Sequence, residues 1–381
     1  MIIKEVEARS IVNSNGEECV EVSVNKKFIG SAGLDRFNRF SVTQLPKTGN
    51  VAQDANKEFN EVLKGLNVSS FEDLNEVEAL IADIDNSAKF NKIGGNAILA
   101  LESALIKGMS NGESIFRFLN PYADDVPQPI FSCIGRSLNY NPANDIEMKE
   151  ILVMPNFESF DKNVVVGQMV HRKIGERLRF NLKNFNGSWI SDRGFDKLLY
   201  SFKYLIQDLN KELDGNISLG VSVGANHLFD GKFYVYKNKM LARNDQIEFV
   251  SKLVKDFDIE YIEDPLEEND FSSCKHFKRG MVSANYLLGS NVERFNQVKN
   301  FVNTIVVKPT QIGSLVKTRE LINNANEEGL NVVLSESSGE TMDTINCHLS
   351  VAWNVPYVKL GLIGKERRAK INEFKEIETN L

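Results

Sequence analysis

The sequence predicts a two-domain α/β protein whose larger, carboxyl-terminal domain is a closed barrel. Beyond Pro121, Pro127 and Pro129, short apolar runs alternate with amphipathic helical segments, the pattern of strands joined by helical crossovers. At least six such units in about 250 residues favour a closed barrel over an open sheet. Several of these strands end in a charged residue, as they do where a barrel presents ligand groups at its mouth. We therefore expect an amino-terminal domain over residues 1–126 and the barrel over residues 127–381.

The amino-terminal domain is expected to start with a hairpin and to continue in helices. Alternating apolar residues predict its strands, and apolar residues at helical spacing predict its helices. The strands are expected over residues 2–12 and 19–24, and the helices over residues 52–66, 71–90 and 94–107. Gly108 follows the last helix directly and is expected to end it. The polar residues 33–50 are expected to form a loop.

The barrel domain shows the alternation most clearly. Strands are expected over residues 151–154, 217–223, 259–262, 304–307, 332–334 and 357–358. Amphipathic helices are expected over residues 195–212, 246–257 and 318–328. Because helical crossovers join parallel strands, we expect a parallel barrel.

Charged residues at the strand ends mark the predicted site. The strand of residues 259–262 stops at Glu263 and Asp264, and later strands end at Lys308, Glu336 and Lys359. Buried charges must be paired, because an unpaired one costs several kcal/mol. The lysines and glutamates are therefore also consistent with a salt-bridge network that needs neither metal nor substrate.

Bulk composition excludes several classes of protein. The 381 residues carry a net charge of −7, which argues against a nucleic-acid-binding surface. No apolar run approaches the ~18 residues of a membrane helix, and residues 1–6 lack a signal-peptide core. The four cysteines are scattered without a CxxC pair. We expect a cytoplasmic protein with free thiols and no membrane or nucleic-acid partner.

A series of short motifs, specific in order and spacing, resembles the enolase family. The matching stretches are residues 5–11 (EVEARSI), 20–22 (VEV), 94–100 (GGNAILA), 261–265 (YIEDP), 308–314 (KPTQIGS), 338–341 (SGET) and 358–359 (VK). The resemblance runs nearly end to end. It implies an α+β amino-terminal domain capping a modified (β/α)8 TIM-type barrel, and a homodimer.

The family reaction implied by the resemblance is the dehydration of 2-phosphoglycerate to phosphoenolpyruvate with Mg²⁺. Such chemistry needs a base, cations that hold a negatively charged ene-diolate, and an acid for the leaving hydroxide. By resemblance, Lys308 matches the base, and Lys359 matches the lysine that binds the carboxylate end of the substrate. Glu263 matches one metal ligand, and Glu150 matches the glutamate near the leaving hydroxyl.

The sequence departs from the family pattern at the residues that carry this chemistry. Ser222 and Ser290 stand where the resemblance implies the other two metal carboxylates, the second of them after a strand like residues 286–288. A hydroxyl is a poor substitute for an anionic ligand of a hard cation. The acid loop falls in residues 185–191 (FNGSWIS), which contain no acid. The phosphate-binding His-Arg is replaced by Glu336 and Ser337.

Two loops also differ from the family pattern. The mobile lid is replaced by residues 33–39 (GLDRFNR), and a Gly-Gly-x-His stretch by residues 135–139 (GRSLN). Arginines in these loops, together with residues that follow a late strand, are candidates for binding an anionic substrate. These candidates are Arg36, Arg39, Arg136, Glu336 and Ser338. His227 has two interpretations, a replacement polar group at the mouth or, as is commoner, a hydrogen-bonded histidine of the core, and Trp189 is expected to pack.

Three functional alternatives remain open from the sequence. We expect a divergent paralogue that has lost the phosphoglycerate reaction, binds Mg²⁺ weakly or not at all, and keeps a pocket for a small carboxylate or phosphate, or a regulatory role. A second alternative is a lyase or isomerase of the wider superfamily with Lys308 as base. The third is an active phosphopyruvate hydratase with rearranged ligands.

Overall fold

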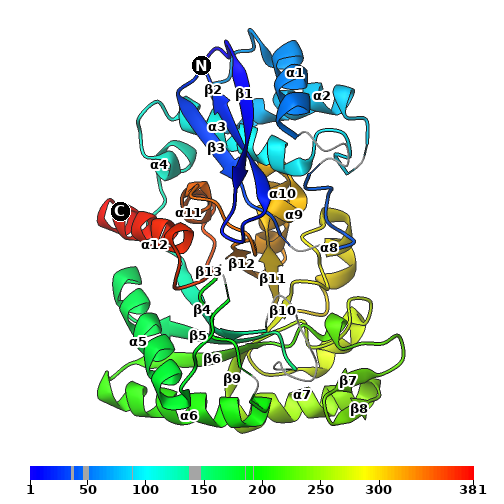
Figure 1. Cartoon of the computed structure of the whole chain (residues 1–381), viewed down its shortest axis with the longest axis vertical. Coiled ribbons are helices and arrows are strands. Elements are labelled where there is room, and N and C mark those ends of the chain that lie inside the picture. Colours follow the sequence, from blue (N-terminus) through cyan, green and yellow to red (C-terminus); the bar gives the residue numbers. More distant parts are fainter. Residues whose placement is uncertain (36–37, 46–50, 88, 137–146, 185, 192) are drawn as a thin grey trace.

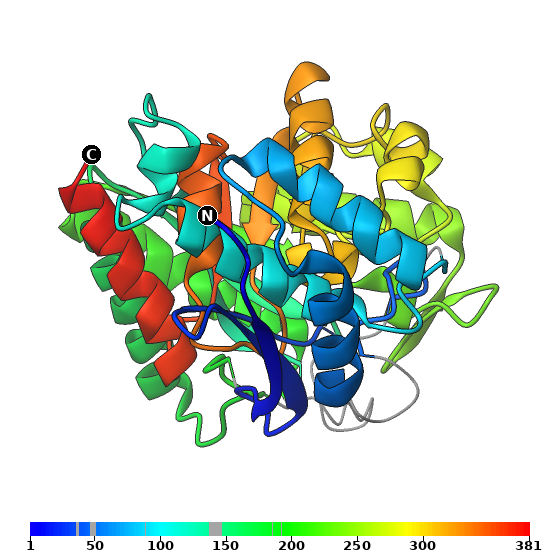
Figure 2. The same ribbon diagram turned by 90° about the horizontal axis from the view of Figure 1, so that it is seen from above.

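The computed structural model describes residues 1–381 apart from 36–37, 46–50, 88, 137–146, 185 and 192. An amino-terminal sheet with helices lies at one end of the long axis, and a barrel wrapped by helices occupies the rest (Figure 1). Seen from above, the amino-terminal elements cover the middle of the barrel (Figure 2). Among the described residues, no helix is both long and apolar enough to cross a membrane.

The amino-terminal sheet is a three-stranded antiparallel meander packed on one long helix. Its strands are β1 (Val6–Val12), β2 (Glu18–Val24) and β3 (Phe28–Ala32). The strand expected from residue 2 thus begins at Val6. The third strand was not predicted, because Gly30 interrupts its β-branched and aromatic pattern. A Cβ at Gly30 would lie 2.1 Å from the Ala100 carbonyl oxygen, so this glycine lets the sheet approach the helix closely.

The helices of this domain are α1 (Val51–Leu63), η1 (Phe71–Asp73), α2 (Leu74–Ile84), α3 (Gly95–Met109) and α4 (Ile115–Leu119). The expectation that Gly108 ends a helix is wrong, because α3 continues through it. A Cβ at Gly108 would lie 2.5 Å from the Met1 sulfur and 3.0 Å from the Phe28 ring. This glycine therefore serves the packing of the helix rather than its termination.

Eight strands close the barrel in the order β10-β11-β12-β13-β4-β5-β6-β9. They are β4 (Gln128–Gly135), β5 (Glu150–Asn156), β6 (Asn216–Ser222), β9 (Ile259–Glu263), β10 (Met281–Ala284), β11 (Thr304–Val307), β12 (Asn331–Ser335) and β13 (Tyr357–Leu360). The expected all-parallel barrel needs one correction, because β5 runs antiparallel to both β4 and β6. Two helices, rather than one, separate β5 from β6, so the chain returns to the same end before it enters β6.

Helices surround the barrel. They are α5 (Phe160–Leu178), α6 (Phe195–Glu212), α7 (Arg243–Phe257), α8 (Val292–Val298), α9 (Pro309–Ile312), α10 (Leu315–Glu327), α11 (Ile345–Ala352) and α12 (Lys365–Thr379). Two 3₁₀ turns, η2 (Ala225–His227) and η3 (Phe271–His276), and the hairpin β7 (Tyr234–Tyr236)–β8 (Lys239–Leu241) complete the domain. The strand inferred near residues 286–288 lies earlier, as β10, and these residues form a turn after it.

The interior of the barrel is apolar below its mouth and polar at it. The apolar layer consists of Ile130, Leu152, Met154, Tyr261, Met281, Val306 and Val333. The mouth faces the amino-terminal domain, whose residue Leu34 forms an isolated β-bridge with Gly339 after β12. A site at the mouth can therefore draw side chains from both domains.

Candidate functional site

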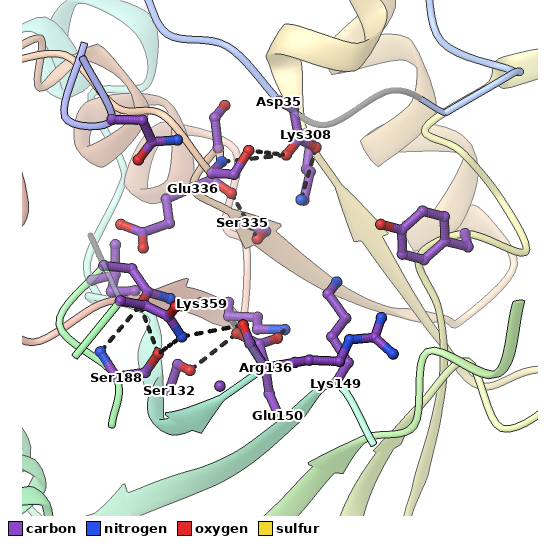
Figure 3. Close-up of a pocket in the computed structure, with 18 of the residues that line it drawn as sticks. Asp35, Ser132, Arg136, Lys149, Glu150, Ser188, Lys308, Ser335, Glu336 and Lys359 are labelled. Carbon is purple, nitrogen blue, oxygen red and sulfur yellow. Dashed lines mark hydrogen bonds and ion pairs between the residues drawn. The ribbon is translucent and has the colours of Figure 1, made fainter. Parts of the chain in front are cut away.

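A polar cavity of about 130 Å³ lies at the barrel mouth (Figure 3). It is lined by Asn15, Asp35, Ser132, Gly135, Arg136, Lys149, Glu150, Asn184, Asn186, Ser188, His227, Tyr286, Lys308, Ser335, Glu336, Ser337, Ser338, Lys359 and Leu360. Most of these residues end strands or lie in the loops that follow them. The structure thus brings Lys308, Glu150, Lys359, Glu336 and Ser338 together at the predicted place.

Glu263, at the end of β9, is fully buried beside this cavity. Its carboxylate accepts hydrogen bonds from the hydroxyls of Ser222 and Tyr261, each at 2.8 Å, and from the Asn285 amide at 2.9 Å. The Lys359 ammonium lies 3.0 Å away. Burial alone would raise the pKa of Glu263, but the lysine charges and these hydrogen bonds hold it far below its ordinary value.

Lys359, on β13, joins Glu263 to Glu150 on β5. Its Nζ lies 2.6 Å from Glu150 Oε2, and the Ser132 hydroxyl donates to the other oxygen at 3.0 Å. Burial would lower the pKa of Lys359, yet the two carboxylates raise it above its usual value. Burial likewise opposes ionisation of Glu150, but Lys359 brings the pKa of that carboxyl below its ordinary value. The structure therefore contains part of the predicted salt-bridge network.

Lys149, the residue before Glu150, is a site residue that the sequence reasoning missed. Its Nζ lies 3.7 Å from Glu263 Oε1 and 5.0 Å from the centre of the Tyr286 ring. Burial would lower the pKa of Lys149, but Tyr286, Glu263 and Glu150 raise it above its ordinary value. Its place at the start of a barrel strand, beside a predicted catalytic residue, was the available clue.

Lys308, at the end of β11, has a different partner from the one expected. Its Nζ lies 2.8 Å from Asp35 Oδ2, and Asp35 belongs to the amino-terminal domain. The expected network paired Lys308 with the barrel glutamates. That expectation is wrong, because Asp35 reaches the mouth through the loop held by the Leu34–Gly339 bridge. Asp35 was not singled out, because it is distant in sequence from Lys308.

Ser290 does not face Glu263. Its hydroxyl donates to Gln311 Oε1 at 2.9 Å and accepts from the Lys308 backbone N–H at 3.0 Å. It thus fixes the residue that follows β11. Ser222, by contrast, bonds directly to Glu263. Of the two serines at the expected ligand positions, one supports the retained carboxylate and the other supports the lysine backbone.

Glu336, after β12, lines the cavity, but the positive charge that balances its carboxylate comes from a residue outside the cavity lining. The buried Arg367 of α12 lies 3.3 Å from Glu336 Oε2, and the Gly361 N–H donates to Oε1 at 3.0 Å. Burial raises the pKa of Glu336 above its ordinary value, and Arg367 opposes that rise. The reversal of local charge expected from Glu336 and Ser337 is thus offset by an arginine of the last helix.

The loop candidates reach different places. Arg136 lines the cavity, whereas Arg39 forms an ion pair with Glu268 and does not line it. Arg36 lies outside the described residues. His227 lines the cavity and packs edge-on against Tyr286 at 4.9 Å.

The stretch that lacks the family acid instead supplies neutral polar groups. Asn186 and Ser188 line the cavity, while Phe185 lies outside the described residues. Trp189 packs as expected and stacks on His171 at 5.1 Å. This part of the wall therefore provides amide and hydroxyl groups in place of a carboxylate.

Comparison with known proteins decides the family. The family model for the C-terminal TIM barrel domain of enolase matches residues 126–381. The chain belongs to the enolase family. It is 29% identical to the enolase of Picrophilus torridus over 399 residues, covering 100% of this chain and 99% of that one. It is 28% identical to the enolases of Thermoplasma acidophilum and Archaeoglobus fulgidus, covering 99% of this chain and 98% and 97% of theirs. The predicted family and fold class are confirmed.

Enolases generally use Mg²⁺, and the side chains at this mouth differ from what that ion requires. Mg²⁺ demands near-octahedral oxygen ligands, usually with one or two carboxylates among them. Here Glu263 already accepts three hydrogen bonds, and the ammonium groups of Lys359 and Lys149 lie 3.0 and 3.7 Å from it. No group of three or more His, Cys, Asp or Glu side chains in the described part of the chain could hold a metal ion. The donor set does not fit a divalent cation.

Proposed function

We propose that this enolase-family protein does not dehydrate 2-phosphoglycerate and that its barrel mouth binds a small anionic ligand without a divalent metal. The observation that carries the proposal is the environment of Glu263. This carboxylate is satisfied by side chains of the chain itself, two of them lysines. The ammonium groups of these lysines lie beside the Glu263 carboxylate, where a bound metal cation would have to lie.

The chemistry of dehydration explains why this exchange matters. Removal of a proton beside a carboxylate creates an ene-diolate with concentrated negative charge, which metal ions stabilise as Lewis acids. Lys149 and Lys359 each carry a single charge, and Glu150 and Glu263 already balance them. Little positive charge is left to hold a doubly charged intermediate. The stretch without an acid, residues 186–191, further removes the group that assists the leaving hydroxide.

The cavity favours a small acid as the ligand. Among the residues that the structure describes, four cationic side chains line it, those of Arg136, Lys149, Lys308 and Lys359, against the three carboxylates of Asp35, Glu150 and Glu336. Several amides and hydroxyls complete the wall. The volume of the cavity is about 130 Å³. A carboxylate or phosphate of few atoms fits these dimensions and the charge of the wall.

An assay of phosphoenolpyruvate formation tests the loss of activity. Purified protein with saturating 2-phosphoglycerate and excess magnesium should give no turnover above a blank, whereas one of the related enolases in the same buffer should turn over rapidly. Robust turnover by this chain would refute the proposal, because dehydration would require a metal site and a catalytic acid, both of which the proposal treats as lost.

A second candidate function is a superfamily lyase or isomerase that uses Lys308 as base. It is favoured by the position of Lys308 in the cavity wall, at the end of a barrel strand. A base must release its proton, so Lys308 would have to leave its ion pair with Asp35. Small carboxylic acids incubated with the protein in D₂O should then exchange their α-protons, as followed by NMR. Exchange that persists in Lys308→Ala would dismiss this base.

A further inference from the structure

The Asp35 carboxylate sits in a cradle of hydrogen-bond donors that the barrel supplies. Oδ2 accepts from Lys308 Nζ at 2.8 Å and from Gln311 Nε2 at 2.7 Å. Oδ1 accepts from the Ser338 backbone N–H at 3.3 Å and from the Ser338 hydroxyl at 3.2 Å. The side chains of Asp35 and Lys308 are only 4% and 10% exposed. Both oxygens of one carboxylate are therefore bound in a largely dry site.

The donors and the acceptor come from different parts of the chain. Lys308 follows β11, Gln311 lies in α9 and Ser338 follows β12, so these three donor residues all belong to the barrel domain. Ser290 bonds both to Gln311 Oε1 and to the Lys308 backbone N–H, which orients two of the donors without Asp35. Asp35 enters from the amino-terminal domain. The donor groups of the barrel thus form a preorganised carboxylate-binding site, and the carboxylate bound there belongs to Asp35 of the same chain.

We propose that this cradle is a binding site for a free carboxylate, and that Asp35 is its built-in competitor. The inference deepens the proposed function, on which it rests, by naming the ligand class. Among the described residues, Lys308 and Gln311 donate to one oxygen of the carboxylate and Ser338 donates twice to the other, so both oxygens are recognised and one donor is a charged ammonium. The rest of the ligand would extend into the adjoining cavity toward Lys149 and Lys359.

Competition from Asp35 sets the expected affinities. A tethered group acts at an effective concentration of about millimolar or more, so a free acid must displace it and binds weakly to the wild-type protein. Removal of the Asp35 side chain frees the donors and leaves Lys308 in need of an anion. We therefore expect Asp35→Ala to bind acetate at least about tenfold more tightly than the wild type does.

Acetate binding to Asp35→Ala tests this inference by calorimetry and by thermal shift. The matched control is Asp343→Ala, because Asp343 also pairs with a lysine of the other domain, Lys107, at 2.8 Å, and does not line the cavity. Acetate should stabilise Asp35→Ala saturably and leave Asp343→Ala and the wild type nearly unchanged. Asp35→Asn, which keeps the shape but not the charge, provides the test if the alanine variant does not fold. It should also bind acetate more tightly than the wild type.

Chloride and inorganic phosphate at equal ionic strength separate a carboxylate site from a general response to anions. Equal stabilisation by chloride, tighter binding of phosphate, equal rescue of Asp343→Ala, or unchanged acetate affinity would each overturn the inference. The proposed function can fail separately. Hydratase turnover by the wild type would refute that function while acetate binding by Asp35→Ala stands. If the wild type shows no hydratase turnover and Asp35→Ala does not bind acetate, the proposed function stands and only the inference about the cradle is refuted.

Discussion

Glu263 illustrates how surroundings decide the chemistry of a retained residue. A carboxylate at this position in an enolase is expected to hold a metal ion, but here Lys149 and Lys359 lie beside it. Desolvation of an isolated carboxylate would be costly, so the two ammonium groups are what make its complete burial tolerable. The residue type was predictable, whereas its partners depended on which neighbouring strands present lysines.

The charge state of Glu263 makes a prediction for the dependence of stability on pH. Its pKa in the folded protein lies below the ordinary value, so its contribution is present above the unfolded-state pKa of about 4.3 and is lost as the pH falls. Glu263→Gln should flatten the loss of unfolding free energy below about pH 4.5, by up to about 1.4 kcal/mol per pH unit. Urea unfolding across this range measures the slope.

Glu260→Gln is the matched control, because Glu260 lies on the same strand and is exposed. It should follow the wild-type slope. Asp264 acts in the opposite sense. Burial and the neighbouring Glu263 raise the pKa of Asp264 to about 6, so its contribution to the stability of the protein is lost as the pH rises toward that value. Its effect lies mostly above the chosen range. Parallel slopes for Glu263→Gln and the wild type would contradict the assignment of Glu263 as a stabilised anion.

At the scale of elements, a glycine directly before β10 lets that strand start close beside β9. Gly280, just before β10, has a φ of +68°. A Cβ there would lie 2.3 Å from the Glu260 carbonyl oxygen. Backbone conformation and space both demand glycine here, so Gly280 allows the chain to pass directly beside the Glu260 carbonyl as it enters β10.

Two glycine substitutions separate these effects. Gly329 has nearly the same φ, +69°, but no atom lies within 4 Å of the position that a Cβ would take there. Gly329→Ala should cost about 1–2 kcal/mol of unfolding free energy from the left-handed backbone alone. Gly280→Ala should cost more, because its clash is with backbone. Urea unfolding of both variants measures the difference, and equal losses would show that the turn relaxes freely.

Element prediction from the sequence worked where apolar runs were regular. The strand over residues 304–307 and the helix over residues 195–212 have the predicted bounds. The strand β4 was missed because Pro129 lies within it, and prolines are poor strand formers. The direction of β5 could not be read from its own residues, since strand polarity depends on the route of the chain around the barrel.

At the scale of the whole molecule, the family motifs located the mouth, and the barrel brought the predicted charged residues together there. What could not be foreseen were contacts between distant segments. Asp35 meets Lys308, and Arg367 meets Glu336, only after the domains and the last helix have packed. Local sequence patterns predict which residues end a strand, but they do not predict which distant residues will form ion pairs with them.

The two parts of the chain share a hydrophobic core, which predicts cooperative unfolding. Leu315, Ile345 and Leu349 of the barrel belong to the same buried cluster as the amino-terminal sheet and helices. Separating the parts would expose these side chains to water. Differential scanning calorimetry should therefore give one transition with equal calorimetric and van't Hoff enthalpies. Two resolved transitions would show that the parts unfold independently.

Calorimetric titration of the metal-free protein with magnesium tests most directly whether lysines have taken the place of the cation. One of the related enolases in the same buffer serves as the positive control. We predict no saturable binding to this chain at magnesium concentrations up to about 10 mM, because the carboxylates of Glu263 and Glu150 are already paired with lysines. Stoichiometric binding with a dissociation constant of about 1 mM or tighter would contradict the account.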